Sequence, residues 1–90
     1  MLRISVIRDS HKGTRFEVEG WLVGPWVEEL RRLSDQALAE SGKLSLDLEK
    51  LRYVDPSGVA LLRDLARRGV AHVNCSPFIQ RQLKEALPCQ

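Results

Sequence analysis

The sequence predicts an α+β domain with a four-stranded, mainly mixed β-sheet, helices packed on one sheet face, and elements in the order ββαβαβα. Two observations predict this class. Short segments in which apolar and polar residues alternate are interleaved with longer segments in which apolar residues recur at helical spacing. Because every second residue of the alternating segments is polar, one face of the sheet should be covered and the other should face water.

The composition narrows the kind of protein. Ninety residues favour a single domain over residues 1–90. The 14 Lys and Arg and the 12 Asp and Glu are interspersed, which does not favour nucleic acid as a partner. No segment approaches the ~20 apolar residues of a membrane-spanning helix, and the N-terminus lacks a signal-peptide pattern, so we expect a cytoplasmic protein without direct membrane insertion. Cys75 and Cys89 lack metal-ligand spacing, and we expect neither metal nor cofactor.

The first two strands should form a hairpin followed by a helix. Residues 2–6 and 16–18 alternate on either side of a glycine-containing turn at residues 9–13. A helix should then begin at Pro25 or Trp26 and end at Ser41, with Gly42 as its C-cap. Its apolar stripe consists of Val27, Leu30, Leu33, Ala37 and Leu38.

Two tryptophans, Trp21 and Trp26, flank the break between the second strand and this helix. They are candidates for an aromatic docking patch, because tryptophans are favoured contact anchors. A small domain also needs large side chains to close its core. We therefore expect at least one of the two to be buried.

The second half of the chain contains the most strongly specified helix start. A third strand is predicted by the alternating leucines of residues 44–48, and an apolar run then ends at Asp55. Asp55 can accept hydrogen bonds from the first free backbone N–H groups of a helix, and Pro56 suits the first helical position. We expect this helix to end near Arg68 and Gly58 to leave its backbone open to close approach by another surface.

The remaining residues predict one more strand and one more helix. Residues 70–75 read as a short fourth strand, and Ser76-Pro77 repeats the pattern of a cap followed by proline. The last helix should stop before Pro88, with an apolar stripe of Ile79, Leu83, Ala86 and Leu87.

In this order of elements the sequence resembles STAS domains, the module of anti-sigma-factor antagonists that is also found on sulfate transporters. The resemblance spans nearly the whole chain. It is carried by Leu44-Ser45-Leu46-Asp47-Leu48-Glu49, by Leu51 and Val54-Asp55-Pro56-Ser57-Gly58 leading to Leu61-Leu62, and by Cys75-Ser76-Pro77 opening a helix that contains Ile79 and Leu83. It implies a protein that catalyses nothing and binds an anti-sigma factor with a kinase-like ATPase fold, thereby freeing a sigma factor.

The residue directly after the motif aspartate departs from the family pattern. The resemblance implies a Ser or Thr directly after the motif aspartate as the residue that a partner kinase phosphorylates, and here that position is Pro56. We therefore expect no phosphorylation switch at the usual position. Ser57 matches the second motif position and is a candidate phosphoacceptor, because a phosphate there would lie near a helix N-terminus. A serine in the first turn is also simply a favourable helix residue.

The predicted partner-binding residues are Asp55, Pro56, Ser57, Gly58, Arg63 and Trp21. Arg63 and Arg67 lie one turn apart and could meet an acidic partner surface, although a solvated helix face partly paired with Asp64 is an equally good interpretation. A second hypothesis makes the chain a regulatory subunit of a transport complex that docks on an ATPase subunit. A serine hydrolase using Ser57 with His72 or His11 is disfavoured, because the sequence contains no GxSxG elbow.

Overall fold

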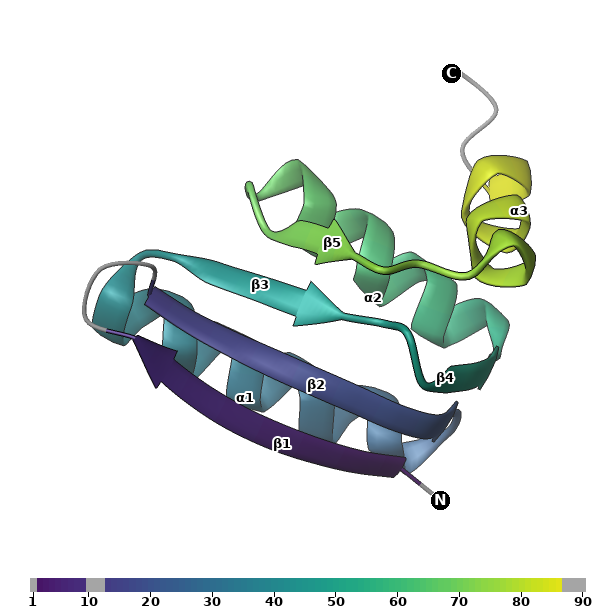
Figure 1. Ribbon diagram of the computed structural model, residues 1–90. Coiled ribbons are helices and arrows are strands. Elements are labelled where there is room, and N and C mark those ends of the chain that lie inside the picture. Colours follow the sequence, from purple (N-terminus) through teal and green to yellow (C-terminus); the bar gives the residue numbers. More distant parts are fainter. Residues whose placement is uncertain (1, 10–12, 87–90) are drawn as a thin grey trace.

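The computed structural model describes residues 2–9 and 13–86 (Figure 1). The predicted helix stop at Pro88, the cysteine at position 89 and the histidine at position 11 lie outside the described residues. The elements in this part of the chain are β1 (Leu2–Asp9), β2 (Gly13–Leu22), α1 (Pro25–Ser41), β3 (Leu44–Asp47), β4 (Leu51–Val54), α2 (Pro56–Arg67), β5 (Ala71–Val73) and α3 (Pro77–Ala86).

The sheet is mixed, as the sequence predicts. β1 runs antiparallel to β2, β2 runs parallel to both β3 and β4, and β3 runs parallel to β5. The strand order is β1-β2-β3-β5, and β4 pairs with the C-terminal end of β2. β2 therefore forms the centre of the sheet, and its C-terminal end meets the end of β4 just before α2 begins.

The strand predicted over residues 44–48 ends at Asp47, and the sheet contains a fifth strand, β4, that the alternating leucines did not indicate. A turn at Glu49 and Lys50 separates β3 from β4, and the register of β2 shifts between Gly20 and Trp21 opposite this turn. Leu48 lies outside both strands, is fully buried, and donates its backbone N–H to the carbonyl of Val73 at 3.0 Å. The apolar pattern thus marked a buried position correctly but assigned it to the wrong element.

Asp47 was expected on the wet face and is instead nearly buried. The Arg15 guanidinium donates to its carboxylate at 2.7 Å, and the Asn74 amide and the Glu49 backbone N–H also donate to it. Burial by itself raises the pKa of Asp47, but these hydrogen bonds outweigh burial and hold the pKa below its usual value. An acidic strand residue is therefore accommodated because donors from β2, from Asn74 just after β5 and from the turn surround it.

The core lies between the sheet and the helices. α1 and α2 lie behind the sheet in the view of Figure 1, and α3 contacts α2 and β4. Along β2 the buried residues alternate with exposed ones, so the opposite sheet face is wet, as predicted. The core is formed mainly by leucine and valine, and its most deeply buried members are Leu22, Leu30, Leu46, Leu48, Leu61, Leu62, Leu65 and Ile79.

The predicted burial of a tryptophan is wrong. Trp21 is 56% exposed and Trp26 is 40% exposed. β2 continues to Leu22, which takes the inward position and is fully buried, so its neighbour Trp21 lies on the other side of the strand. The core is closed by aliphatic side chains and Phe16, which leaves both tryptophan rings in contact with solvent.

Candidate functional site

The Asp55 carboxylate joins the starts of two helices. Its Oδ1 accepts hydrogen bonds from the backbone N–H of Gly58 and from the Ser57 hydroxyl, each at 2.8 Å. Its Oδ2 accepts a hydrogen bond from the backbone N–H of Gly24 at 2.9 Å. Gly24 directly precedes α1, so one carboxylate caps α2, as the sequence predicts, and also holds the entry to α1.

These hydrogen bonds set the charge state of Asp55. The hydrogen bond from the Gly24 N–H lowers the pKa of Asp55 most. Burial raises the pKa by a smaller amount, and the hydrogen bonds from Gly58 and Ser57 lower it further. The pKa of Asp55 therefore lies below its usual value. A stable negative charge at this point complements the positive end of the α2 dipole.

The four predicted partner-binding residues of this helix start differ in their exposure to solvent. Pro56 and Ser57 are exposed and Asp55 is partly exposed, whereas Gly58 is buried. A Cβ atom at Gly58 would lie 2.7 Å from Cγ1 of Val54 and 2.9 Å from the carbonyl oxygen of Leu22. The prediction that Gly58 admits a partner is therefore wrong, because the protein's own strands occupy the space next to it.

An exposed aromatic pair lies beside this helix start. Trp21 on β2 and Tyr53 on β4 are register partners, and their ring centroids are 6.0 Å apart with the planes inclined at 58°. Both rings are exposed, Tyr53 to 41%. Sequence reasoning selected Trp21 but missed Tyr53, whose available signal was its place two residues before Asp55, next to the inward-facing Val54.

Tyr53 also borders an open pocket of about 390 Å³ between β4, α2 and α3. The pocket is lined by Tyr53, Val54, Pro56, Val59, Ala60, Arg63 and Gln82. It combines apolar walls with one guanidinium and one side-chain amide. We call Trp21, Tyr53, Pro56, Ser57, Ala60 and Arg63 the α2 docking surface.

The arginines on α2 and directly after it differ in their ion-pair partners. Arg68, which follows α2, pairs with Asp35 at 2.9 Å and with Asp64 at 3.5 Å. Asp64 was predicted to pair with part of the exposed helix face, and the residue with which it pairs is Arg68. Neither Arg63 nor Arg67 forms an ion pair with any of the residues that the structure describes.

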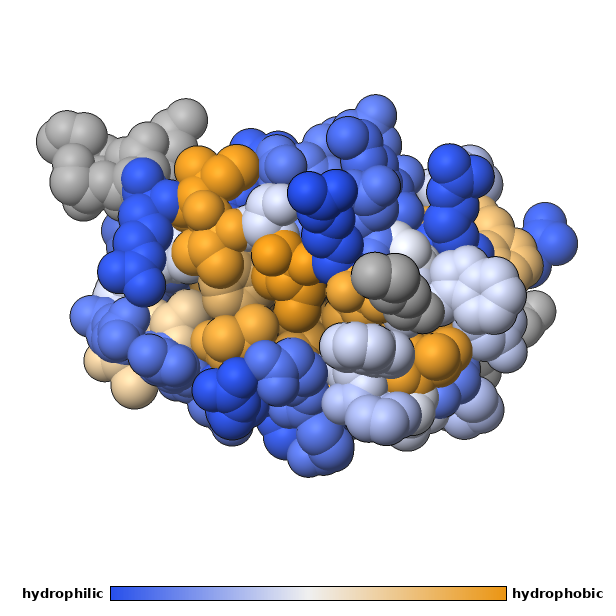
Figure 2. All heavy atoms as spheres, turned by 90° about the horizontal axis from the view of Figure 1, so that it is seen from below, coloured by the Kyte–Doolittle hydropathy of each residue, from blue (hydrophilic) through white to orange (hydrophobic). Residues whose placement is uncertain are grey.

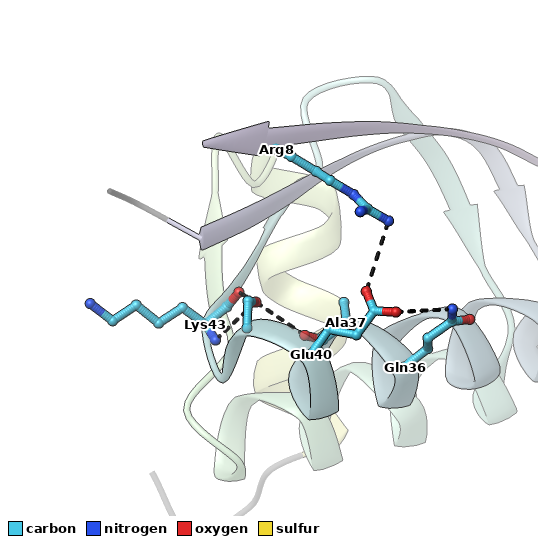
Figure 3. A network of polar contacts seen from close by, with 6 residues as sticks. Arg8, Gln36, Ala37, Glu40 and Lys43 are labelled. Carbon is cyan, nitrogen blue, oxygen red and sulfur yellow. Dashed lines mark hydrogen bonds and ion pairs between the residues drawn. The ribbon is translucent and has the colours of Figure 1, made fainter. Parts of the chain in front are cut away.

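A second apolar surface lies between β1 and α1, where apolar side chains gather in Figure 2. Val6 is 47% exposed there, beside a pocket of about 100 Å³ that is also lined by Phe16, Leu33 and Ala37. Figure 3 shows the polar end of this groove, where Arg8 lies 3.8 Å from Glu40 and the Gln36 amide donates to the same carboxylate. Its charged groups already have partners, so this groove does not indicate the chemistry of a ligand.

Ser57 and His72, the candidate hydrolase pair, form no hydrogen bond with each other in the described part of the chain. The Ser57 hydroxyl donates to Asp55, and burial lowers the pKa of His72. Within residues 2–9 and 13–86, no group of three or more His, Cys, Asp or Glu is placed to hold a metal ion. In the same part of the chain, no helix is both long and apolar enough to span a membrane.

Two solved structures have a fold similar to that of this chain. The chain superposes on the anti-sigma factor antagonist SpoIIAA in its unphosphorylated form with a TM-score of 0.74 and 19% identity, over 91% of this chain and 82% of that one. It has the SpoIIAA-like, STAS-type fold. A second neighbour is a DUF3478-family protein with a SpoIIAA-like fold from Shewanella loihica, at a TM-score of 0.60 and 17% identity, over 94% of this chain and 75% of that one. No family model and no curated protein sequence matches the chain.

Proposed function

We propose that this protein is a non-enzymatic interaction domain of the anti-sigma-factor-antagonist type, which binds a kinase-like anti-sigma factor through the α2 docking surface. The observation that carries the proposal is the exposed Trp21–Tyr53 pair beside the helix start that Asp55 organises. Trp, Tyr and Arg dominate the binding energy of protein interfaces, and all three types meet on this surface. The SpoIIAA-like fold supports the same class of function.

The alternative partner is the ATPase subunit of a transport complex. The same surface would serve that role, so the two roles differ in the partner and not in the site. Affinity purification from the native cell, followed by mass spectrometry, separates them by the type of ATPase that is recovered with the protein.

Replacing Trp21 by alanine tests the surface. We expect binding to the recovered ATPase to weaken by about 30-fold or more, because truncating a central interface tryptophan costs roughly 2 kcal/mol or more. The control is Ile7→Ala, which removes a 44% exposed residue at the other end of the open sheet face. Isothermal titration calorimetry with purified ATPase measures both. Equal affinities for wild type and Trp21→Ala would contradict the proposed surface.

Ser57 is the alternative candidate for phosphorylation. Pro56 has no hydroxyl, whereas the Ser57 hydroxyl is exposed and its Oγ lies 2.8 Å from Oδ1 of Asp55. A phosphate on Ser57 would add about −1.5 to −2 charge next to this carboxylate and would change the charge of the docking surface. The expected consequence is release of the partner.

The corresponding experiment incubates the protein with its ATPase partner, ATP and Mg²⁺ and follows the intact mass. We expect no change in mass, because Pro56 stands where the family's acceptor hydroxyl would be, whereas Pro56→Ser should gain one phosphate. Ser57→Asp, which carries about half of the phosphate charge, should weaken partner binding relative to Ser57→Ala. An added phosphate on the wild-type protein that maps to Ser57 and is absent in Ser57→Ala would overturn this expectation.

A further inference from the structure

The pocket beside Tyr53 contains two buried polar atoms whose hydrogen-bonding capacity is unused. Nε of Arg63 and Oε1 of Gln82 are both inaccessible to solvent, and neither has a hydrogen-bond partner among the residues that the structure describes. Gln82 is oriented by its Nε2, which donates to the carbonyl of Val54 at 3.3 Å. Unpaired buried polar groups cost free energy, so a pocket whose lining includes two of them is a candidate binding site.

The charge of this pocket is also unbalanced. Five other arginines of the described chain each lie within 4 Å of a carboxylate: Arg8, Arg15, Arg31, Arg32 and Arg68. Arg63 has no such neighbour among the side chains that the structure describes, although its own side chain is half-buried. The walls around it are apolar, consisting of Val59, Ala60, Pro56 and the Tyr53 ring. A guanidinium in such surroundings binds a carboxylate more strongly than an exposed one does, because less water competes for it.

We propose that this pocket receives an acidic residue of the partner protein that lies next to an apolar side chain. The partner carboxylate accepts hydrogen bonds from the terminal N–H groups of the Arg63 guanidinium, and the apolar side chain packs on Tyr53 and Val59. This inference rests on the proposed function and adds the chemistry of the partner contact. It also makes Gln82, on α3, part of a site whose other residues lie on β4 and α2.

A small probe tests the pocket without the partner. N-acetyl-phenylalanine carries a carboxylate, an amide N–H and an aromatic ring, and N-acetyl-phenylalanine amide is its neutral counterpart. We expect the acid to bind with a millimolar Kd and to shift the backbone amide resonances of Val59, Ala60 and Arg63 in ¹H–¹⁵N spectra. The neutral amide should bind about fivefold more weakly, because it lacks the charge-assisted hydrogen bond.

Arg63→Gln is the test variant, and Arg67→Gln is its matched control on the same helix. The first should lower the affinity for the acid by about fivefold and bring it close to that of the neutral amide, while the second should leave the affinity within about twofold. Equal affinities for acid and amide, equal losses in the two variants, shifts confined to other residues, or no saturable binding would each overturn the inference.

The recovered ATPase provides the second arm. Arg63→Gln should weaken its binding by about tenfold, and Arg67→Gln should leave it within about twofold. If Trp21→Ala weakens partner binding while Arg63→Gln does not, the docking surface stands and the acidic contact is wrong. If neither substitution has an effect, the proposed function itself fails at this surface.

Discussion

Replacing Gly58 by alanine is expected to lower the free energy of unfolding by about 2 kcal/mol, although alanine is the better helix former. Gly58 lies in the first turn of α2 without a positive φ, so helix propensity alone would favour alanine by about 1 kcal/mol. The added Cβ, however, would lie 2.7 Å from Cγ1 of Val54 and 2.9 Å from the carbonyl oxygen of Leu22. Overpacking of this kind costs about 1–3 kcal/mol or more, and a backbone atom cannot turn aside as a side chain can.

Urea unfolding at neutral pH measures this loss, with Arg67→Ala as the control on the exposed face of the same helix. The control should change the unfolding free energy by no more than about 0.5 kcal/mol. Combining Gly58→Ala with Val54→Ala should recover little stability, because the clash with Leu22 remains and a buried valine is lost. A Gly58→Ala protein as stable as wild type would show that α2 can move away from the end of β2.

Replacing Asp55 by asparagine is expected to lower the free energy of unfolding by about 2 kcal/mol at pH 7. Asparagine has one acceptor oxygen, which can still bind the Gly58 N–H. Its amide group would then face the Gly24 N–H, so that two donors meet where Oδ2 now accepts a bond at 2.9 Å. The loss exceeds that of an ordinary N-cap because the entry to α1 is released along with the start of α2.

The same substitution should change the pH dependence of stability. The pKa of Asp55 is lower in the folded than in the unfolded protein, so its contribution is fully present above the unfolded pKa of about 3.9 and is lost as the pH falls through the folded value. Asp47 acts in the same direction, because its pKa is also lowered. Unfolding free energies measured between pH 3 and 7 should therefore fall less steeply at acidic pH for Asp55→Asn than for wild type. Parallel curves would contradict the assigned charge of Asp55.

Several features of the fold could be predicted from the sequence because they depend on neighbours along the chain. The helix start at Asp55-Pro56 and the end of α1 at Gly42 are of this kind, and Gly42 adopts a left-handed φ of 72° as a C-cap requires. The alternation along β2 likewise predicted which sheet face is wet. Each of these features follows from hydrogen bonds and side-chain directions set within one turn or one strand.

The errors concern contacts between distant segments. A strand pattern cannot show that Leu48 would leave the strand, since its partner Val73 lies on another element. The burial of Gly58 depends on Leu22, which is 36 positions away in the numbering. The exposure of Trp21 depends on how far β2 extends, which is set by its pairing with β4.

The sequence by itself therefore determined most of the elements, the capped helix start and the wet sheet face of this protein, because local propensities and periodicity decide them. Only the tertiary structure decided the site. It placed Tyr53 beside Trp21, brought Gln82 of α3 to Arg63 of α2, and joined Gly24 to Asp55 across the ends of β2 and β4. These pairs come together through strand register and helix packing, which depend on the whole core and leave no signal in any one segment.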